Sequence, residues 1–183
     1  MEKKIIIVGA GLVGSLWAVY MRKAGYKVVI YERRYDIRKA EISEGKSINL
    51  ALSERGWNSL KTAGIKEDIE KIAIPMSGRV MHSEEGKLTY QAYGKKDEAI
   101  YSVSRGHLNA IMMDLAEKKG NSEIHYQHQC IDADLKNGKI TLKNLKTNEI
   151  FEDQADVVFA ADGAYSAIRY NSMQKIDRFN FSQ

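Results

Sequence analysis

Apolar residues near the start of the chain follow two different spacings. The run Ile5–Val8 is unbroken, which is typical of a strand covered on both faces within a parallel sheet. Residues 12–23 instead place apolar side chains at helical spacing, and Gly25 is suited to end that helix. A second unbroken run, Val28–Tyr31, predicts a second buried strand. Strand, glycine turn, helix and strand fit within about 30 residues, which is the length of one βαβ unit.

The middle of the chain predicts a loop, a helix and then short strands. Residues 36–48 are polar with little periodicity, so we expect a surface loop there, and Ser53 is placed to cap a helix that runs to Thr62. Between Gly78 and Val103, short extended segments are separated by glycine turns. This pattern predicts an antiparallel meander inserted between α/β units.

The last third of the chain returns to the α/β pattern. Apolar residues lie on one stripe over 105–119, which predicts a helix, and Asn137-Gly138 is a strong signal for a tight turn. The strands predicted in this part are Ile124–Cys130, Ile131–Leu135, Lys139–Leu145 and Val157–Phe159.

Size and charge are ordinary for a globular protein. The chain has 183 residues, of which 44% are hydrophobic, so it is long enough to bury a core. Lys and Arg outnumber Asp and Glu by 28 to 24, and the formal net charge is +4. The basic residues are scattered and acids lie between most of them, so a nucleic-acid partner is not expected.

The numbers and positions of cysteine and histidine argue against a disulfide within the chain and against a metal site. Cys130 is the single cysteine, and the four histidines, His82, His107, His125 and His128, are dispersed without metal-ligand spacing. The opening apolar run is too short for a signal sequence, and no segment approaches the roughly 20 apolar residues of a membrane span. We therefore expect a cytoplasmic protein with no membrane segment in this chain.

A glycine motif follows the first predicted strand. Gly9 allows a sharp turn, Gly11 lets the backbone approach a pyrophosphate, and Gly14 allows close packing of helix on strand. The amide groups at the start of the following helix attract the phosphate anion. Glu32 ends the second strand, where a carboxylate can accept hydrogen bonds from ribose hydroxyls. The four residues together predict an adenine-dinucleotide site.

This motif leaves the nucleotide and the class of protein open. It does not separate FAD from NAD, although Glu32 disfavours a 2′-phosphate because the two negative charges would repel. An NAD-linked dehydrogenase and a noncatalytic dinucleotide- or protein-binding module are therefore alternatives to a flavoenzyme.

A segment far from the glycines favours FAD. Residues 161–166, Ala-Asp-Gly-Ala-Tyr-Ser, together with Arg169 resemble the Asp-Gly motif of the class A flavoprotein aromatic hydroxylases. Ala161 stands where many members have glycine. The resemblance implies an α/β fold with a Rossmann-like FAD-binding domain of the glutathione-reductase type, and FAD as the cofactor.

Further segments resemble the members of that family that hydroxylate kynurenine. Their order and spacing match over essentially the whole chain; the segments are Ser47–Ser53, Arg55-Gly56, Ile74–Met76, Met81–Ser83, Tyr93-Gly94, Ser102–Arg105 and Arg178–Gln183. The resemblance implies L-kynurenine as a small-molecule substrate and NADPH as reductant. It also implies that residues 1–183 form an incomplete FAD-binding domain, with 78–103 as part of an antiparallel substrate-domain sheet. We expect a fragment of this kind to be impaired alone and to expose apolar surface that another copy can cover.

The resemblance assigns individual residues to the two ligands. Besides the glycines, it places Val13, Glu32, Arg33, Ala51, Arg105, Asp162 and Gly163 at FAD, and Arg79 and Tyr93 at the substrate. A guanidinium suits the carboxylate of an amino acid, and a tyrosine hydroxyl can complete its recognition. No side chain in the chain is expected to act as a nucleophile or general base, because the cofactor carries the chemistry.

Overall fold

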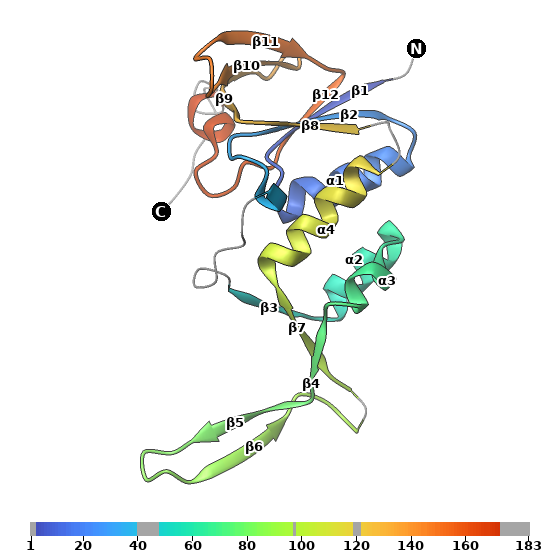
Figure 1. Ribbon diagram of the computed structural model, residues 1–183, viewed down its shortest axis with the longest axis vertical. Helices are drawn as coiled ribbons and strands as arrows, with labels where there is room; N and C mark the ends of the chain where they lie inside the picture. The colour runs from blue at the N-terminus through green and yellow to red at the C-terminus, as the bar shows by residue number, and fades with distance from the viewer. Residues whose placement is uncertain (1–2, 40–47, 97, 119–121, 173–183) are drawn as a thin grey trace. The chain divides into compact units, whose positions relative to one another are not determined.

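The computed structural model describes residues 3–39, 48–96, 98–118 and 122–172. The chain divides into two compact units, of which the first combines Met1–Glu41 with Met112–Gln183 and the second is Ile42–Ile111. Figure 1 traces the helices and strands of both. Each sheet formed by the described residues lies within one unit.

The first unit is built around a parallel sheet of four strands in the order β12-β1-β2-β8. Its strands are β1 (Lys4–Val8), β2 (Lys27–Glu32), β8 (Ser122–Tyr126) and β12 (Val157–Ala160). Burial is nearly complete along β1 and β2, as the unbroken apolar runs predict. The predicted βαβ unit is therefore confirmed.

Helix α1 (Leu12–Lys23) joins β1 to β2 and has the predicted bounds. It ends at Ala24, and Gly25 follows with a φ of +85°, a left-handed conformation that glycine adopts without strain. Trp17 packs edge-on against Phe159 of β12, with 5.2 Å between ring centroids. The helix thus packs on the parallel sheet through its apolar side.

A three-stranded antiparallel sheet covers the other face of the parallel sheet (Figure 1). Its strands are β9 (His128–Asp134), β10 (Lys139–Asn144) and β11 (Ile150–Gln154), followed after β12 by the short η2 (Ile168–Ser172). Between the sheets lies a core of Ile6, Val8, Val29, Tyr31, Cys130, Ile140, Leu142 and Ile168. The predicted strand Ile124–Cys130 is interrupted at Gln127, whose φ of +59° turns the chain from one sheet into the other.

The second unit contains helices and a small sheet. Its helices are α2 (Glu54–Ala63) and α3 (Lys66–Glu70), and α4 (Arg105–Glu117) begins in this unit and ends in the first. Its sheet has the order β3-β7-β4, with β3 (Asn49–Leu52), β4 (Ile74–Met76) and β7 (Ile100–Ser104). Ser53 occupies the predicted N-cap position of α2, but its side chain makes no capping hydrogen bond.

The predicted meander over 78–103 is wrong in one of its pairings. Strands β5 (Gly78–His82) and β6 (Leu88–Ala92) form a separate two-stranded hairpin. Strand β7 instead pairs with β3 and β4, and not with β6. The partners of β7 lie far from it in the sequence, so local patterning shows that the strand exists but not where it pairs.

Candidate functional site

The glycine turn after β1 is too tight for side chains at two positions. A Cβ on Gly14 would lie 1.9 Å from the carbonyl oxygen of Gly9, and a Cβ on Gly9 would lie 2.5 Å from the carbonyl oxygen of Ala161. Gly9 also has a φ of +102°, which disfavours any L side chain. Because the clashing atoms belong to the backbone, neither position can accept a larger residue without moving the turn.

Gly11 is different because nothing crowds it. No heavy atom lies within 4 Å of the place where its Cβ would be. The turn therefore needs no glycine here for its own packing. A bare backbone facing open space is what a ligand requires to approach the peptide groups closely.

The start of α1 is prepared for an anion. Its N-cap residue, Gly11, offers no side chain, and within the described chain no acidic residue occupies the first helical turn. The first amides of a helix have no partner inside the helix, and the helix dipole is positive at this end. A phosphate placed here would meet unopposed N–H donors. Val13, at the second helical position, is 72% exposed.

Glu32 lies at the end of β2 and is 4% exposed. Its Oε2 accepts a hydrogen bond of 2.8 Å from the Ala10 amide, inside the glycine turn. Its Oε1 accepts bonds from the backbone amide and Nε of Arg34, at 2.9 and 2.8 Å. Burial alone would raise the pKa of the Glu32 carboxyl, but the bonds from Arg34 and Ala10 outweigh it and hold the pKa below its ordinary value. The carboxylate is thus ionised and fixed beside the turn.

Arg34 is a residue of this site that the sequence reasoning missed. The resemblance implies Arg33, whose assignment to FAD remains a prediction, and the structure adds Arg34, whose guanidinium is the one bonded to Glu32. The signal was present in the sequence, since residues two apart in an extended segment project to the same side.

The Asp162-Gly163 segment lies directly against the glycine turn. The Cα of Asp162 is 3.1 Å from the position of a Cβ on Gly9. One carboxylate oxygen of Asp162 accepts a 2.8 Å bond from the amide of Ala167, which fixes the loop leading into η2. Gly163 has a φ of +82°. Two motifs separated by about 150 residues therefore meet at the ends of the neighbouring strands β1 and β12.

The other two predicted FAD residues belong to the second unit. Ala51 lies on β3 opposite Ser102, and Arg105 begins α4 with its amide 3.4 Å from the carbonyl oxygen of Ile48. The side chain of Arg105 is exposed. Their assignment to FAD remains a prediction.

The β5–β6 hairpin places the predicted substrate residues on one of its faces. Arg79 pairs with Gln91 across the hairpin, and both Nε and Nη2 of Arg79 donate to the Gln91 side-chain oxygen at 2.9 and 2.6 Å. The Tyr93 amide donates a hydrogen bond to the carbonyl oxygen of Ser77, which extends the backbone pairing of the two strands by one residue pair. Because alternate residues share a face, Arg79, Gln91 and Tyr93 project together.

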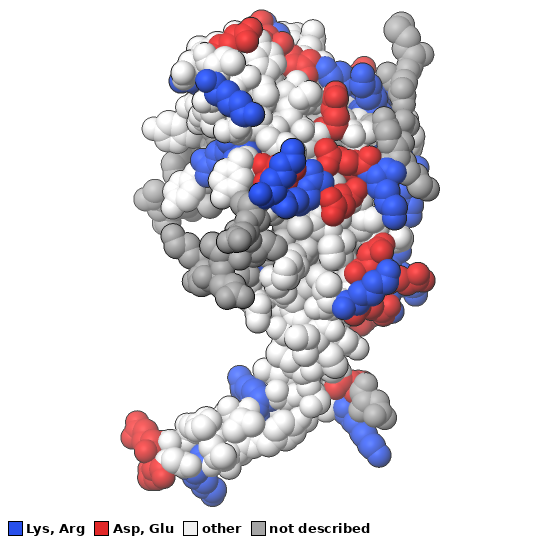
Figure 2. Space-filling view, viewed as in Figure 1, with Lys and Arg blue, Asp and Glu red and all other residues white. Residues whose placement is uncertain are grey.

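The opposite face of the hairpin is apolar and exposed. It carries Val80, Leu88 and Tyr90, which are 55%, 61% and 59% exposed. In the space-filling view most of the hairpin surface is uncharged, and acidic side chains gather at its turn (Figure 2). The hairpin is therefore amphipathic in most of its length, with Met81 as an apolar residue on the polar face and His82 as a polar residue on the apolar face.

The chemistry of the first unit fits an adenine dinucleotide. It brings together an open glycine, an uncapped helix start and a buried ionised carboxylate, which suit a pyrophosphate and a ribose. Among the described residues no group of His, Cys, Asp or Glu is arranged to hold a metal ion. In the same ranges no helix has the length and apolarity needed to cross a membrane.

Comparison with known proteins gives a consistent result. The family model "FAD binding domain" matches residues 2–180. The chain is 45% identical over 182 residues to kynurenine 3-monooxygenase of Christiangramia forsetii and 42% identical over 180 residues to that of Anopheles gambiae. These alignments cover 100% and 98% of this chain but 40% and 37% of the relatives. The chain therefore spans about two fifths of the length of these curated relatives.

Solved structures share the fold. A flavin-dependent monooxygenase in complex with FAD and substrate matches with a TM-score of 0.78 at 15% identity, covering 93% of this chain and 32% of that one. The p-nitrophenol 4-monooxygenase of Pseudomonas putida matches with a TM-score of 0.76 at 23% identity, covering 92% and 43%.

Proposed function

The chain belongs to the FAD-binding domain family, and from this premise we propose that it is the cofactor-binding part of an enzyme that hydroxylates L-kynurenine with NADPH and O2. Similarity to kynurenine 3-monooxygenases over the whole chain supports the substrate. The observation that carries the cofactor assignment is the contact of the glycine turn with the Asp162-Gly163 segment, beside the buried carboxylate of Glu32.

The residues of the first unit divide the binding of the nucleotide among them. The backbone at Gly11 and the first amides of α1 would hold the pyrophosphate, and Glu32 would accept hydrogen bonds from the adenosine ribose. FAD, when bound, supplies the redox chemistry of the hydroxylation. The polypeptide contributes binding and orientation, so the site needs no nucleophilic side chain.

The polar face of the hairpin would recognise the amino-acid end of kynurenine. The guanidinium of Arg79 has five N–H donors. Its Nε–H and one Nη2–H donate to the side-chain oxygen of Gln91. The remaining donors can bind a carboxylate, while the Tyr93 hydroxyl, on the same face, can bind a second polar group of the substrate.

Two measurements on the full-length gene product test this function. The purified protein should show the absorbance spectrum of bound flavin, and kynurenine should stimulate NADPH oxidation.

Arg79→Ala should raise the KM for kynurenine by roughly tenfold or more, because a hydrogen bond to a charged group is lost. Lys87→Ala, which removes a cation from an exposed position of the same hairpin, should leave the KM unchanged. Unchanged kinetics in Arg79→Ala would remove the substrate assignment, and a protein without flavin would remove the cofactor assignment.

A further inference from the structure

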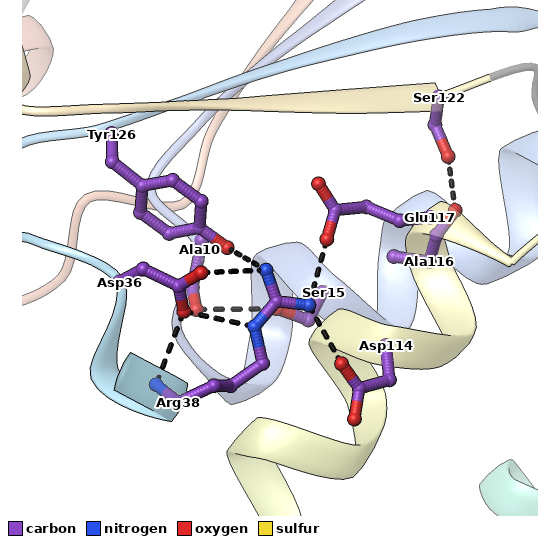
Figure 3. Close-up of polar contacts among 9 residues, drawn as sticks. All are labelled: Ala10, Ser15, Asp36, Arg38, Asp114, Ala116, Glu117, Ser122 and Tyr126. Atoms are coloured by element: carbon purple, nitrogen blue, oxygen red, sulfur yellow. Dashed lines mark hydrogen bonds and ion pairs between the residues drawn. The ribbon is translucent and has the colours of Figure 1, made fainter. Parts of the chain in front are cut away.

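All five N–H groups of the Arg38 guanidinium have an acceptor (Figure 3). Nε and one Nη2 hydrogen bind the two carboxylate oxygens of Asp36, at 2.8 and 2.9 Å. The other Nη2 hydrogen binds the Tyr126 hydroxyl at 2.8 Å. Nη1 binds Asp114 and Glu117, each at 2.7 Å. A single side chain thus joins the segment after β2 to strand β8 and to the C-terminal half of α4.

The Arg38–Asp36 pair at the centre of this junction is largely withdrawn from water, whereas Asp114 at its edge is exposed. The side chains of Arg38 and Asp36 are 21% and 8% exposed, and the guanidinium lies 5.7 Å from the centre of the Tyr126 ring. The Arg38 hydrogen bond holds the pKa of Asp36 below its ordinary value, so the pair is ionised at neutral pH. Charge-assisted, bidentate contacts of this kind fix geometry more firmly than neutral ones.

The segment that Arg38 holds begins at the ribose-binding position. Only residues 33–37 separate Arg38 from Glu32, and Arg34 of this segment supplies the donors that orient the Glu32 carboxylate. The segment is irregular apart from η1 (Ile37–Lys39), and one further tie is the 3.1 Å bond from the Gln127 amide to the Arg34 carbonyl. Connecting segments move readily unless they are anchored, so the orientation of Arg34 depends on the anchor at Arg38.

We propose that Arg38 is a positioning residue for adenosine recognition: it does not touch the nucleotide, but its five bonds hold the segment in which Arg34 aligns Glu32 with the ribose. The inference rests on the proposed function, in which Glu32 binds that ribose. A carboxylate whose orientation varies has to be ordered when it binds a ligand hydroxyl, and this cost weakens the binding. Loosening the anchor should therefore weaken recognition of the ribose before it affects the fold.

Calorimetric titration of the protein with ADP and with 2′-deoxy-ADP tests this proposal. The wild type should bind ADP about tenfold more tightly than 2′-deoxy-ADP, as expected for one hydrogen bond to a charged group. Arg38→Gln should bind ADP about tenfold more weakly and 2′-deoxy-ADP with unchanged affinity, so that the two become equal. Lys139→Gln, which removes an exposed ion pair to Glu152 elsewhere in the same unit, should behave as the wild type.

The outcomes separate this inference from the proposed function. A wild type that binds neither nucleotide would overturn both. A wild type that discriminates between them, with an Arg38→Gln variant that discriminates equally well, would overturn the role of Arg38 alone. If Arg38→Gln does not fold, Asp114→Asn replaces it, because Asp114 is 64% exposed and supplies one of the five acceptors. In that variant the ratio of the affinities for ADP and 2′-deoxy-ADP should fall by about twofold to threefold. An unchanged ratio would overturn the proposal.

Discussion

The glycine turn of the first unit and the β5–β6 hairpin of the second both carry predicted ligand contacts, but they support them differently. In the turn, Glu32 is 4% exposed and bonded to both Ala10 and Arg34. On the hairpin, Arg79 is bonded across the ribbon to Gln91, and Tyr93 is 43% exposed. The predicted nucleotide contacts therefore lie against a hydrophobic core, whereas the predicted substrate contacts lie on a hairpin that has no core of its own.

This difference has a physical origin in the two architectures. The turn follows β1, which pairs with β2 and β12 and whose residues are buried except at Lys4. A two-stranded hairpin has no layer of its own to bury its apolar face, and isolated hairpins are marginally stable. Changes at the crowded positions of the turn, Gly9 and Gly14, should thus disturb fold and binding together, whereas changes on the hairpin should leave the fold intact.

Replacing Gly14 should give the largest effect. Gly14→Ala places a Cβ 1.9 Å from the Gly9 carbonyl oxygen, so the turn must open and nucleotide binding should be lost altogether. Thermal unfolding and a titration with FAD would measure both consequences.

Gly11→Ala is the matched control for this substitution. Its Cβ meets nothing within 4 Å, so the melting temperature should stay near that of the wild type while FAD binding weakens. If the two variants melted alike and bound FAD alike, the division of roles among the glycines would be wrong.

Glu32→Gln should have the next largest effect. It keeps an oxygen for the Ala10 amide but removes the charge that holds Arg34 and accepts the ribose hydroxyls. We expect ADP affinity to fall roughly tenfold to a hundredfold, the range of a hydrogen bond to a charged group. Equal affinity of variant and wild type in calorimetry would contradict the placement of the ribose.

Acid should weaken the turn region through the same carboxylate. The pKa of Glu32 is lowered in the folded state, so its stabilisation is complete above the ordinary carboxyl pKa and is lost as the pH falls through the lowered value. The free energy of unfolding, followed with denaturant, should therefore be flat near neutrality and decline below about pH 4.5. The decline should be smaller in Glu32→Gln, and an identical profile would argue against an ionised Glu32.

Leu88→Ser on the hairpin should give the smallest effect. Leu88 is 61% exposed, so the free energy of unfolding should change by less than about 0.5 kcal/mol. Ile6→Ala in β1, whose side chain is fully buried, should cost about 2–5 kcal/mol and provides the contrast. A large loss in Leu88→Ser would show that the apolar face of the hairpin is covered in the protein.

The sequence predicted best those features that depend on neighbouring residues. The bounds of α1, the N-cap at Ser53 and the glycine after Ala24 follow from local periodicity and local backbone preferences. The proximity of Gly9 to Asp162 could be expected only from the resemblance to a family, because nothing local links two motifs so far apart.

Features that depend on distant partners were missed. Strand β3 was not predicted because it is short and its pairing with β7 is decided by tertiary structure. Arg38 lies in the segment for which the sequence predicts a polar loop, and its acceptors Asp114, Glu117 and Tyr126 come from elements more than 70 residues away. A polar residue in a loop can be an anchor, and only the fold reveals which one.

The bond between Glu32 and the Ala10 amide constrains any redesign of nucleotide preference. An engineer who exchanges this acid for a basic residue, in order to admit a phosphorylated ribose, also deprives a buried backbone donor of its acceptor. Cofactor choice and integrity of the loop are therefore coupled at a single side chain, and a successful exchange has to supply a new acceptor for Ala10 first.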